Sequence, residues 1–119
     1  MRELTKAFKT LSDETRLRIL NVLMERECCV CEVMQALAIS QSRASRNLAA
    51  LYDAGFLEVR REGHWALYLI AKEGLKEYYM DLIEAVRKAL EGNETALLDR
   101  QRLKNAERVG PSRVCKASH

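Results

Sequence analysis

The chain has 119 residues, the length of one domain, and 48% of them are hydrophobic, which is enough for a small core. Charged residues make up 31% of the chain and proline occurs once, a balance typical of soluble, helix-rich proteins. No apolar run approaches the roughly 20 residues needed to cross a membrane, and the N-terminus lacks a signal-peptide pattern. We therefore expect a cytoplasmic protein with no membrane partner.

The positive charge is unevenly distributed along the chain. Residues 1–97 hold 14 Lys and Arg against 15 Asp and Glu, whereas residues 98–119 hold 6 against 2, so the net charge of +3 arises in the C-terminal tail. Charge alone therefore does not predict nucleic-acid binding by the body of the chain.

Apolar spacing and capping signals predict helices throughout the first half of the chain. They cover residues 4–11, 14–26, 28–37 and 41–54. Ser40 is expected to cap the last of these helices, and Gly55 to end it. The third and fourth helices are short and are joined by a turn of three or four residues, which makes them a helix-turn-helix.

The period of the apolar residues changes after Gly55. Alternation over residues 56–61 and 64–70, with Glu62-Gly63 as the tight turn between them, predicts a β-hairpin. A helix-turn-helix followed at once by a hairpin is a winged helix. The expected fold is therefore mainly α with a β-hairpin wing.

The last part of the chain is predicted to be helical again. A long amphipathic helix is expected over residues 71–90, and a more polar one over residues 94–108 after a break at Gly92-Asn93. Gly110-Pro111 opens a tail that we expect to be disordered.

Residues 4–90 resemble the ArsR/SmtB family of metal-sensing repressors. Three stretches carry the resemblance in the right order and spacing. The family's helix-opening signature is similar to LSDETRLRIL (11–20), and its metal box, usually written ELCVCDL, is similar to ECCVCEV (27–33). Its recognition helix and wing are similar to QSRASRNL (41–48) with AGFL (54–57) and RREG (60–63). The resemblance implies a winged helix-turn-helix repressor that binds double-stranded operator DNA as a homodimer.

The start of the helix over residues 41–54 suits base reading, because exposed polar side chains there can reach the major groove. The candidates are Gln41, Ser42, Arg43, Ser45 and Arg46. Arg43 is expected to pair with guanine and Gln41 with adenine, and no base is assigned to Asn47. At the wing, the candidates for phosphate or minor-groove contacts are Arg60, Arg61 and His64. The alternative is that these cations are ordinary solvated charges.

A dimer would place two recognition helices one helical turn apart, about 34 Å, on a pseudo-palindrome. The expected dimer surface joins the first helix to the long later helix, a pairing that the resemblance also implies. Its residues are Leu4, Phe8, Leu11, Tyr79, Leu82, Val86 and Leu90. Residues 1–92 would then form the DNA-binding and dimerisation domain, and residues 93–119 a helical extension with a flexible basic tail. The alternative is that this stripe packs only within one chain.

Three of the four cysteines, Cys28, Cys29 and Cys31, fall within four positions, and Cys115 lies in the tail. Adjacent cysteines rarely close a disulfide, so in a cytosolic chain the cluster indicates metal ligands or reactive thiols. Thiolates are soft ligands that suit As(III), Sb(III), Cd(II), Pb(II), Cu(I) and Zn(II). Small buried residues at a helix start are the structural alternative.

The number of available ligands favours a metalloid. Cys29 and Cys31 match the two cysteines of the family box. Relatives that sense Cd or Pb add cysteines from an N-terminal arm, and those that sense Zn use His on the long C-terminal helix; this chain has neither. As(III) takes three thiolates, so we expect As(III), with Sb(III) as a second inducer and no organic cofactor. The third position is left open between Cys28, Cys115 from the same chain or its partner, and no third protein ligand.

Two expectations concern the mechanism. Residues two apart on an α-helix point about 200° away from each other, so binding by Cys29 and Cys31 is expected to unwind the first turn of their helix and release DNA. The helix N-terminus is also expected to lower the thiol pKa.

The alternatives keep the cysteines but change their role. One is a redox switch in which Cys115 pairs with Cys29 or Cys31, and another is a sensor of Cd(II), Pb(II) or Zn(II). A thiol enzyme or metal carrier is a third class. The sequence has no His near the cysteines, no Gly-rich phosphate loop and no paired acid–base set, so we do not expect an enzyme.

Overall fold

The helices and strands follow the predicted order. The computed structural model describes residues 1–72 and 76–109. Within them lie α1 (Arg2–Leu11), α2 (Glu14–Glu25), α3 (Val30–Leu37), α4 (Gln41–Asp53), β1 (Leu57–Glu62), β2 (Trp65–Ile70), α5 (Glu77–Ala89) and α6 (Glu94–Asn105). Helices α3 and α4 form the helix-turn-helix, and the antiparallel β1–β2 hairpin forms the wing. The predicted winged helix-turn-helix fold is confirmed.

Local capping explains where the helices of the first half begin and end. The Asp13 carboxylate accepts the Arg16 N–H at 3.0 Å, and the Ser40 hydroxyl accepts the Arg43 N–H at 3.3 Å. Each bond satisfies a backbone donor that has no partner inside the helix. Helix α3 ends at Ala38, whose φ of 56° and ψ of 49° are left-handed and turn the chain toward α4.

The hairpin turn lies one residue later than the sequence predicted. Glu62 pairs with Trp65 across the strands, so the turn is Gly63-His64 and not Glu62-Gly63. Gly63 has a φ of +60°, which glycine adopts without steric cost at the first central position of a tight turn.

The last two helices are shorter than predicted. Helix α5 begins at Glu77 and not at residue 71, because Ala71 is buried and its N–H donates to the Phe56 carbonyl at 3.0 Å. Helix α6 ends at Asn105 and not at residue 108. Leu75 and the Gly110-Pro111 tail lie outside the described residues.

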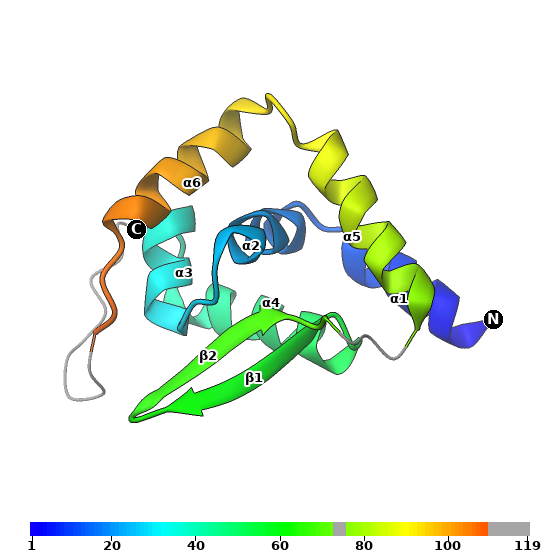
Figure 1. The fold of residues 1–119 in the computed structure, drawn as a ribbon, viewed down its shortest axis with the longest axis horizontal. Helices are drawn as coiled ribbons and strands as arrows, with labels where there is room; N and C mark the ends of the chain where they lie inside the picture. The colour runs from blue at the N-terminus through cyan, green and yellow to red at the C-terminus, as the bar shows by residue number, and fades with distance from the viewer. Residues whose placement is uncertain (73–75, 110–119) are drawn as a thin grey trace.

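Helix α2 lies at the centre of the molecule and carries much of the core. Its Ile19, Leu20 and Val22 are fully buried. In Figure 1, α5 and α6 form an arch on one side of α2, and the β1–β2 hairpin lies on the other side. No helix among residues 1–72 and 76–109 is long and apolar enough to cross a membrane.

A buried ion pair connects α6 to α2, and a further hydrogen bond connects the same arginine to α3. The fully buried Asp99 carboxylate accepts two bonds from the Arg18 guanidinium, at 2.8 and 2.9 Å, and one from Arg102 at 3.3 Å. Arg18 also donates to the Leu37 carbonyl at 2.9 Å, at the end of α3. The extension thus packs against the helix-turn-helix and shares its core through Leu103.

Candidate DNA-binding surface and cysteine site

Helix α4 presents a polar face away from the core. Its apolar side is buried through Ala44, Leu48 and Leu51. On the other side, four of the predicted DNA-contacting residues are exposed and the fifth is half-buried: Gln41, Ser42, Arg43 and Arg46, and Ser45. The fold therefore gathers the predicted base-reading residues on one accessible surface of the recognition helix.

A set of hydrogen bonds holds α4 against the start of α2. The Arg43 guanidinium donates to the buried Thr15 hydroxyl at 2.7 Å, and the Arg16 Nε donates to Asn47 Oδ1 at 3.0 Å. Asn47 Nδ2 in turn donates to the Arg43 carbonyl at 2.9 Å. The buried Asn47 thus has a structural role, and no local pattern in the sequence predicts its partner Arg16 on α2.

At the wing, the three predicted contact residues are all exposed, but they differ in their surroundings. Arg61 and His64 lie near the hairpin turn. The Arg60 guanidinium is paired with the carboxylates of Glu27 and Glu62, and its bond to Glu27 holds the pKa of that carboxyl below its usual value. Arg60 therefore links the wing to the residue that precedes the cysteines.

The cysteine segment lies between α2 and α3. Cys29 and Cys31 are buried in one small cluster with Leu67 of β2. Cys28 instead belongs to the main core, and its backbone forms two hydrogen bonds with Tyr68 of β2, at 3.1 and 2.8 Å. The three neighbouring cysteines thus divide into a pair, Cys29 and Cys31, and a separate Cys28.

The expectation that binding must unwind a helix rests on a wrong premise. Cys29 is the residue before α3 and has an extended backbone, with φ −82° and ψ 169°, whereas Cys31 lies in the first turn. The angle of about 200° between residues two apart applies only within a helix. Cys29 and Cys31 therefore share a cluster while α3 stays intact.

The expected lowering of the thiol pKa is also wrong for Cys28 and Cys29. Burial raises the pKa of the Cys28 thiol to about 12. Burial also raises the pKa of Cys29, and hydrogen bonds to its thiol from nearby backbone N–H groups do not offset this. The loss of solvation of a thiolate here outweighs the helix terminus.

Glu32 organises the charges around the cysteines. Its carboxylate accepts the Cys29 N–H at 2.9 Å, the Arg26 guanidinium at 2.6 Å and the Arg108 guanidinium at 3.1 Å. Burial raises the pKa of Glu32, but these three bonds together outweigh it and leave the pKa below its usual value. Glu32 was not predicted as a site residue, although an acid three positions after a helix cap is a recognisable signal.

Residues 106–109, which we call the strap, lie across the cysteine site. The Gln35 side chain exchanges two hydrogen bonds with the Glu107 backbone, at 2.8 and 3.0 Å. The Trp65 Nε1–H donates to the Val109 carbonyl at 2.8 Å, and Arg108 lies over the Trp65 ring, 5.7 Å from its centre. The strap therefore contacts both α3 and β2.

The strap ends beside the cysteine pair. Val109 packs against the cluster of Cys29, Cys31 and Leu67. Cys115 follows six positions later and lies outside the described residues. Within residues 1–72 and 76–109 there is no group of three His, Cys, Asp or Glu side chains that could hold a metal ion. The described residues thus bring two cysteine sulfurs together in one place: Cys29, which is free, and Cys31, which is disulfide-bonded in this structure.

The predicted dimer residues differ in their exposure. Phe8 is 54% exposed and Leu4 39% exposed, which is unusual for such apolar side chains in a monomer. The half-buried members of the set are Leu11, Leu82, Val86 and Leu90. These residues remain the candidates for a dimer surface.

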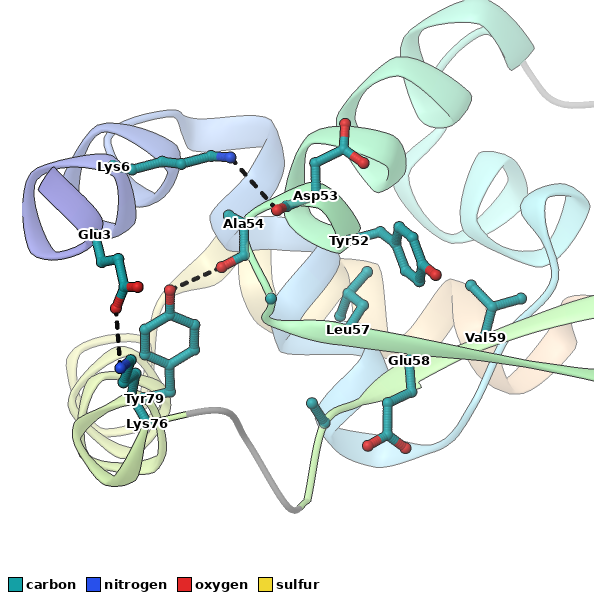
Figure 2. Close-up of a pocket in the computed structure, with 12 residues that line it drawn as sticks. Glu3, Lys6, Tyr52, Asp53, Ala54, Leu57, Glu58, Val59, Lys76 and Tyr79 are labelled. Carbon is teal, nitrogen blue, oxygen red and sulfur yellow. Dashed lines mark hydrogen bonds and ion pairs between the residues drawn. The ribbon is translucent and has the colours of Figure 1, made fainter.

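Tyr79 differs from the rest of that set because it packs within its own chain. It is buried, its ring stacks on Phe56 with 4.5 Å between the ring centres, and its hydroxyl donates to the Ala54 carbonyl at 2.8 Å. Figure 2 shows this bond at the edge of an open pocket of about 840 Å³, with the Glu3–Lys76 ion pair beside it.

Comparison with known proteins shows the family. Residues 13–59 match the family described as "Bacterial regulatory protein, arsR family". The chain is 41% identical over 102 residues to the arsenic resistance transcriptional regulator ArsR2 of Pseudomonas putida, and the match covers 84% of this chain and 85% of that protein. This chain belongs to the ArsR family.

Other members of the family match shorter stretches. ArsR1 of the same bacterium is 48% identical over 67 residues, 56% of this chain, and the chain spans 52% of that relative's length. A cadmium resistance regulatory protein CadC homolog of Staphylococcus aureus is 38% identical over 76 residues, 63% of each chain. The match to ArsR2 therefore covers more of this chain than these two matches do.

A solved structure agrees with the fold. The homodimeric winged helix-turn-helix DNA-binding domain Mb0332 of Mycobacterium bovis is similar to this chain with a TM-score of 0.64 and 30% identity, over 78% of this chain and 82% of that domain. This ArsR-family chain is therefore a winged helix-turn-helix transcriptional regulator and not an enzyme.

Proposed function

We propose that this chain is a homodimeric repressor that binds operator DNA through α4 and the wing and is released by As(III), with Sb(III) as a second inducer. The observation that carries this proposal is the buried pair Cys29 and Cys31, which lies at the start of the helix-turn-helix and against the wing strand β2. Relatives named arsenic resistance regulators support it. In a bacterium such a repressor works in the cytoplasm, where the DNA is.

For DNA reading, the proposal uses the exposed side chains of α4 and the wing. Gln41, Ser42, Ser45 and Arg46 enter the major groove, together with Arg43. Arg61 and His64 contact phosphates at the hairpin end, and Arg60 does so if DNA draws it from Glu27. The dimer forms through the apolar residues of α1 and α5. In such a dimer the two copies of α4 lie about 34 Å apart, one helical turn of DNA.

The cysteine pair suits a neutral metalloid. In the reduced protein, in which Cys31 is a thiol, arsenous acid, As(OH)₃, reacts with three thiols; each thiol sulfur forms one As–S bond, and each hydroxyl leaves as water with the thiol proton. The product carries no net charge, so a buried cluster accepts it at low cost. Three thiolates around Cd(II) carry a net negative charge, and burying that charge is expensive. Cys29 and Cys31 are both buried.

We propose Cys115 of the same chain as the third thiolate. The strap lies over the cysteine pair and ends at Val109, packed against the cluster. Cys115 follows six positions after Val109, and an extended chain over six positions reaches about 20 Å. Cys28 is the weaker candidate because it belongs to the main core and its backbone is bonded to Tyr68.

Two contacts provide a route from the cysteines to the DNA-binding surface. Cys28 is hydrogen-bonded to Tyr68 of the wing, and the neighbouring Glu27 is paired with Arg60. Ligand binding at Cys29 and Cys31 changes the backbone next to both contacts and to the start of α3. We propose that the wing and α4 thereby lose the relative position that fits DNA, with α3 remaining helical.

A second candidate function is a cadmium sensor, which the S. aureus relative favours. The test measures fluorescence anisotropy of a labelled duplex, selected by the wild-type protein from a random library, during titration with As(III), Sb(III), Cd(II), Pb(II) and Zn(II). As(III) and Sb(III) should release the DNA. Release by Cd(II) or Zn(II) alone would overturn the metalloid proposal, and release by peroxide without metal would favour a redox switch.

Single variants locate the ligands in the same assay. Cys29→Ser and Cys31→Ser should abolish release by As(III) while leaving DNA affinity in its absence within about twofold. Cys115→Ser should raise the As(III) concentration needed for release at least tenfold, whereas the matched control Cys28→Ser should not. The reverse result for Cys115 and Cys28 would make Cys28 the third ligand.

A further inference from the structure

The arginines and lysines of this chain fall into two groups. Among residues 1–72 and 76–109, eight of them form ion pairs with nearby acids, as Arg60 and Arg100 do with Glu27 and Glu25, and four that form none lie on the wing, after β2, on α5 and on α6: Arg61, Lys72, Lys88 and Lys104. Six on α1, α2 and α4 form no ion pair within residues 1–72 and 76–109: Arg2, Lys6, Lys9, Arg16, Arg43 and Arg46. Two of these lie on α4, and the other four extend from it.

The four cations outside α4 line one shallow pocket. Arg2, Lys6 and Lys9 of α1 and Arg16 of α2 border a depression of about 450 Å³ that contains no acidic side chain. Residues 1–97 together carry slightly more negative than positive charge. The pocket is therefore a local concentration of positive charge on a nearly neutral body, and it attracts a polyanion.

Direct contacts join this pocket to the recognition helix. The Arg16 guanidinium donates to the Thr10 carbonyl of α1 at 3.3 Å and to the Asn47 side chain of α4 at 3.0 Å. Farther along, the Lys6 ammonium donates to the Asp53 carbonyl at the end of α4, at 3.5 Å (Figure 2). Arg16 and Lys6 thus each connect the pocket to α4.

The basic side of α1 is separate from its apolar side. At 100° per residue, Arg2, Lys6 and Lys9 point about 160° away from Leu4, Phe8 and Leu11, and Ala7 and Thr10 between them pack inside the chain. A dimer that covers the apolar side therefore leaves the basic side open to solvent.

We propose that the basic pocket formed by Arg2, Lys6, Lys9 and Arg16 binds phosphates of the same DNA duplex that α4 reads, and so extends the DNA contact onto α1. This rests on the proposed function of α4. Phosphate contacts of this kind add affinity and position the protein, but they carry no base preference. The partner is double-stranded DNA because the pocket adjoins the recognition helix.

The test compares the full-length protein with the triple variant R2Q/K6Q/K9Q on the selected duplex. Each lost phosphate contact should flatten the plot of log affinity against log salt by about 0.9. Loss of three contacts per protomer should therefore flatten it by up to about 5 for a dimer. The control variant K88Q/K104Q removes two exposed cations from α5 and α6 and should leave the slope unchanged. Arg16 is kept because it also holds Asn47.

Two further measurements separate the possible failures. Base preferences of the triple variant, measured on the random library, should equal those of the wild type, and thermal midpoints should agree within a few degrees. If the slope is unchanged although Arg46→Ala loses base preference, α1 does not contact DNA and this inference is wrong. If the wild type itself has no base preference, the proposed function of α4 fails first. If the triple variant binds anionic vesicles less tightly than the wild type but has the same DNA slope, the pocket contacts a membrane surface and the DNA contact is refuted.

Discussion

Removing one partner of the buried ion pair between α6 and α2 is expected to destabilise the fold, and the substitution Asp99→Asn tests this. The Asp99 side chain is 0% exposed and accepts three charge-assisted hydrogen bonds, two from Arg18 and one from Arg102. Asparagine has nearly the same shape, but it removes the negative charge and turns an NH₂ group toward guanidinium donors. The variant therefore leaves Arg18 in place without its partner.

The magnitude follows from how deeply each partner is buried. Breaking a buried pair by removing one charge costs about 3–5 kcal/mol. Arg18 is 19% exposed and can recover some water contact, so we expect the low end, about 3 kcal/mol. For a domain of this size that corresponds to a fall in Tm of roughly 10 °C. The Asp99 bonds also raise the pKa of Arg18, which agrees with a pair that favours charge.

The assay is urea unfolding followed by circular dichroism, at fixed protomer concentration because dimerisation contributes to apparent stability. The matched control is Arg102→Gln, which removes the longer contact to Asp99, at 3.3 Å. The Arg102 side chain is 36% exposed, so this substitution should lower the free energy of unfolding by less than about 1 kcal/mol. A loss below about 1 kcal/mol for Asp99→Asn, equal to that of the control, would show that α6 is not held by this pair.

Three smaller substitutions test local features in the same unfolding assay. Tyr79→Phe removes the hydroxyl bond to Ala54 but keeps the stacking on Phe56, so stability should fall by about 1 kcal/mol; no change would mean that the bond contributes nothing. Gly63→Ala forces a methyl group into a backbone with φ +60°, where the surrounding space is open, and should cost about 1 kcal/mol through backbone strain alone. Ala38→Gly relieves the left-handed strain between α3 and α4 and should be neutral to stabilising by about 1 kcal/mol; a clear loss would contradict that account.

The fold was predictable because local signals and the apolar period agreed. Ser40 and Asp13 act as the caps that their residue types favour, and the change from a helical to an alternating period marks the wing correctly. The turn was misplaced by one residue because both Glu62-Gly63 and Gly63-His64 place the glycine in a two-residue turn, and only the strand register distinguishes them.

The cysteine site was only partly predictable. Sequence spacing identified Cys29 and Cys31 as a candidate pair, and the two do share one cluster. It could not show that Cys29 precedes the helix as its cap while Cys31 lies inside it. Because Cys29 is outside the helix, the two residues can meet without unwinding α3. Burial depends on the whole fold, so sequence spacing could not predict that the pKa of Cys28 is raised. The strap contacts join residues more than 40 positions apart, such as Trp65 and Val109, and no local sequence pattern predicts such contacts.

The contacts that connect the cysteine segment to the wing are of the size that regulation needs. A hundredfold loss of operator affinity corresponds to about 2.7 kcal/mol, and a ligand can supply it only by binding the two shapes of the protein unequally. The Cys28–Tyr68 contact consists of two backbone hydrogen bonds, and the Arg60 guanidinium forms two charge-assisted hydrogen bonds with Glu27. At about 0.5–1.5 kcal/mol each, loss of the two backbone bonds on one side of the equilibrium contributes about 1–3 kcal/mol, which is of the required size. Rearrangement of residues 27–29 alone can therefore account for the release of DNA, without melting a helix.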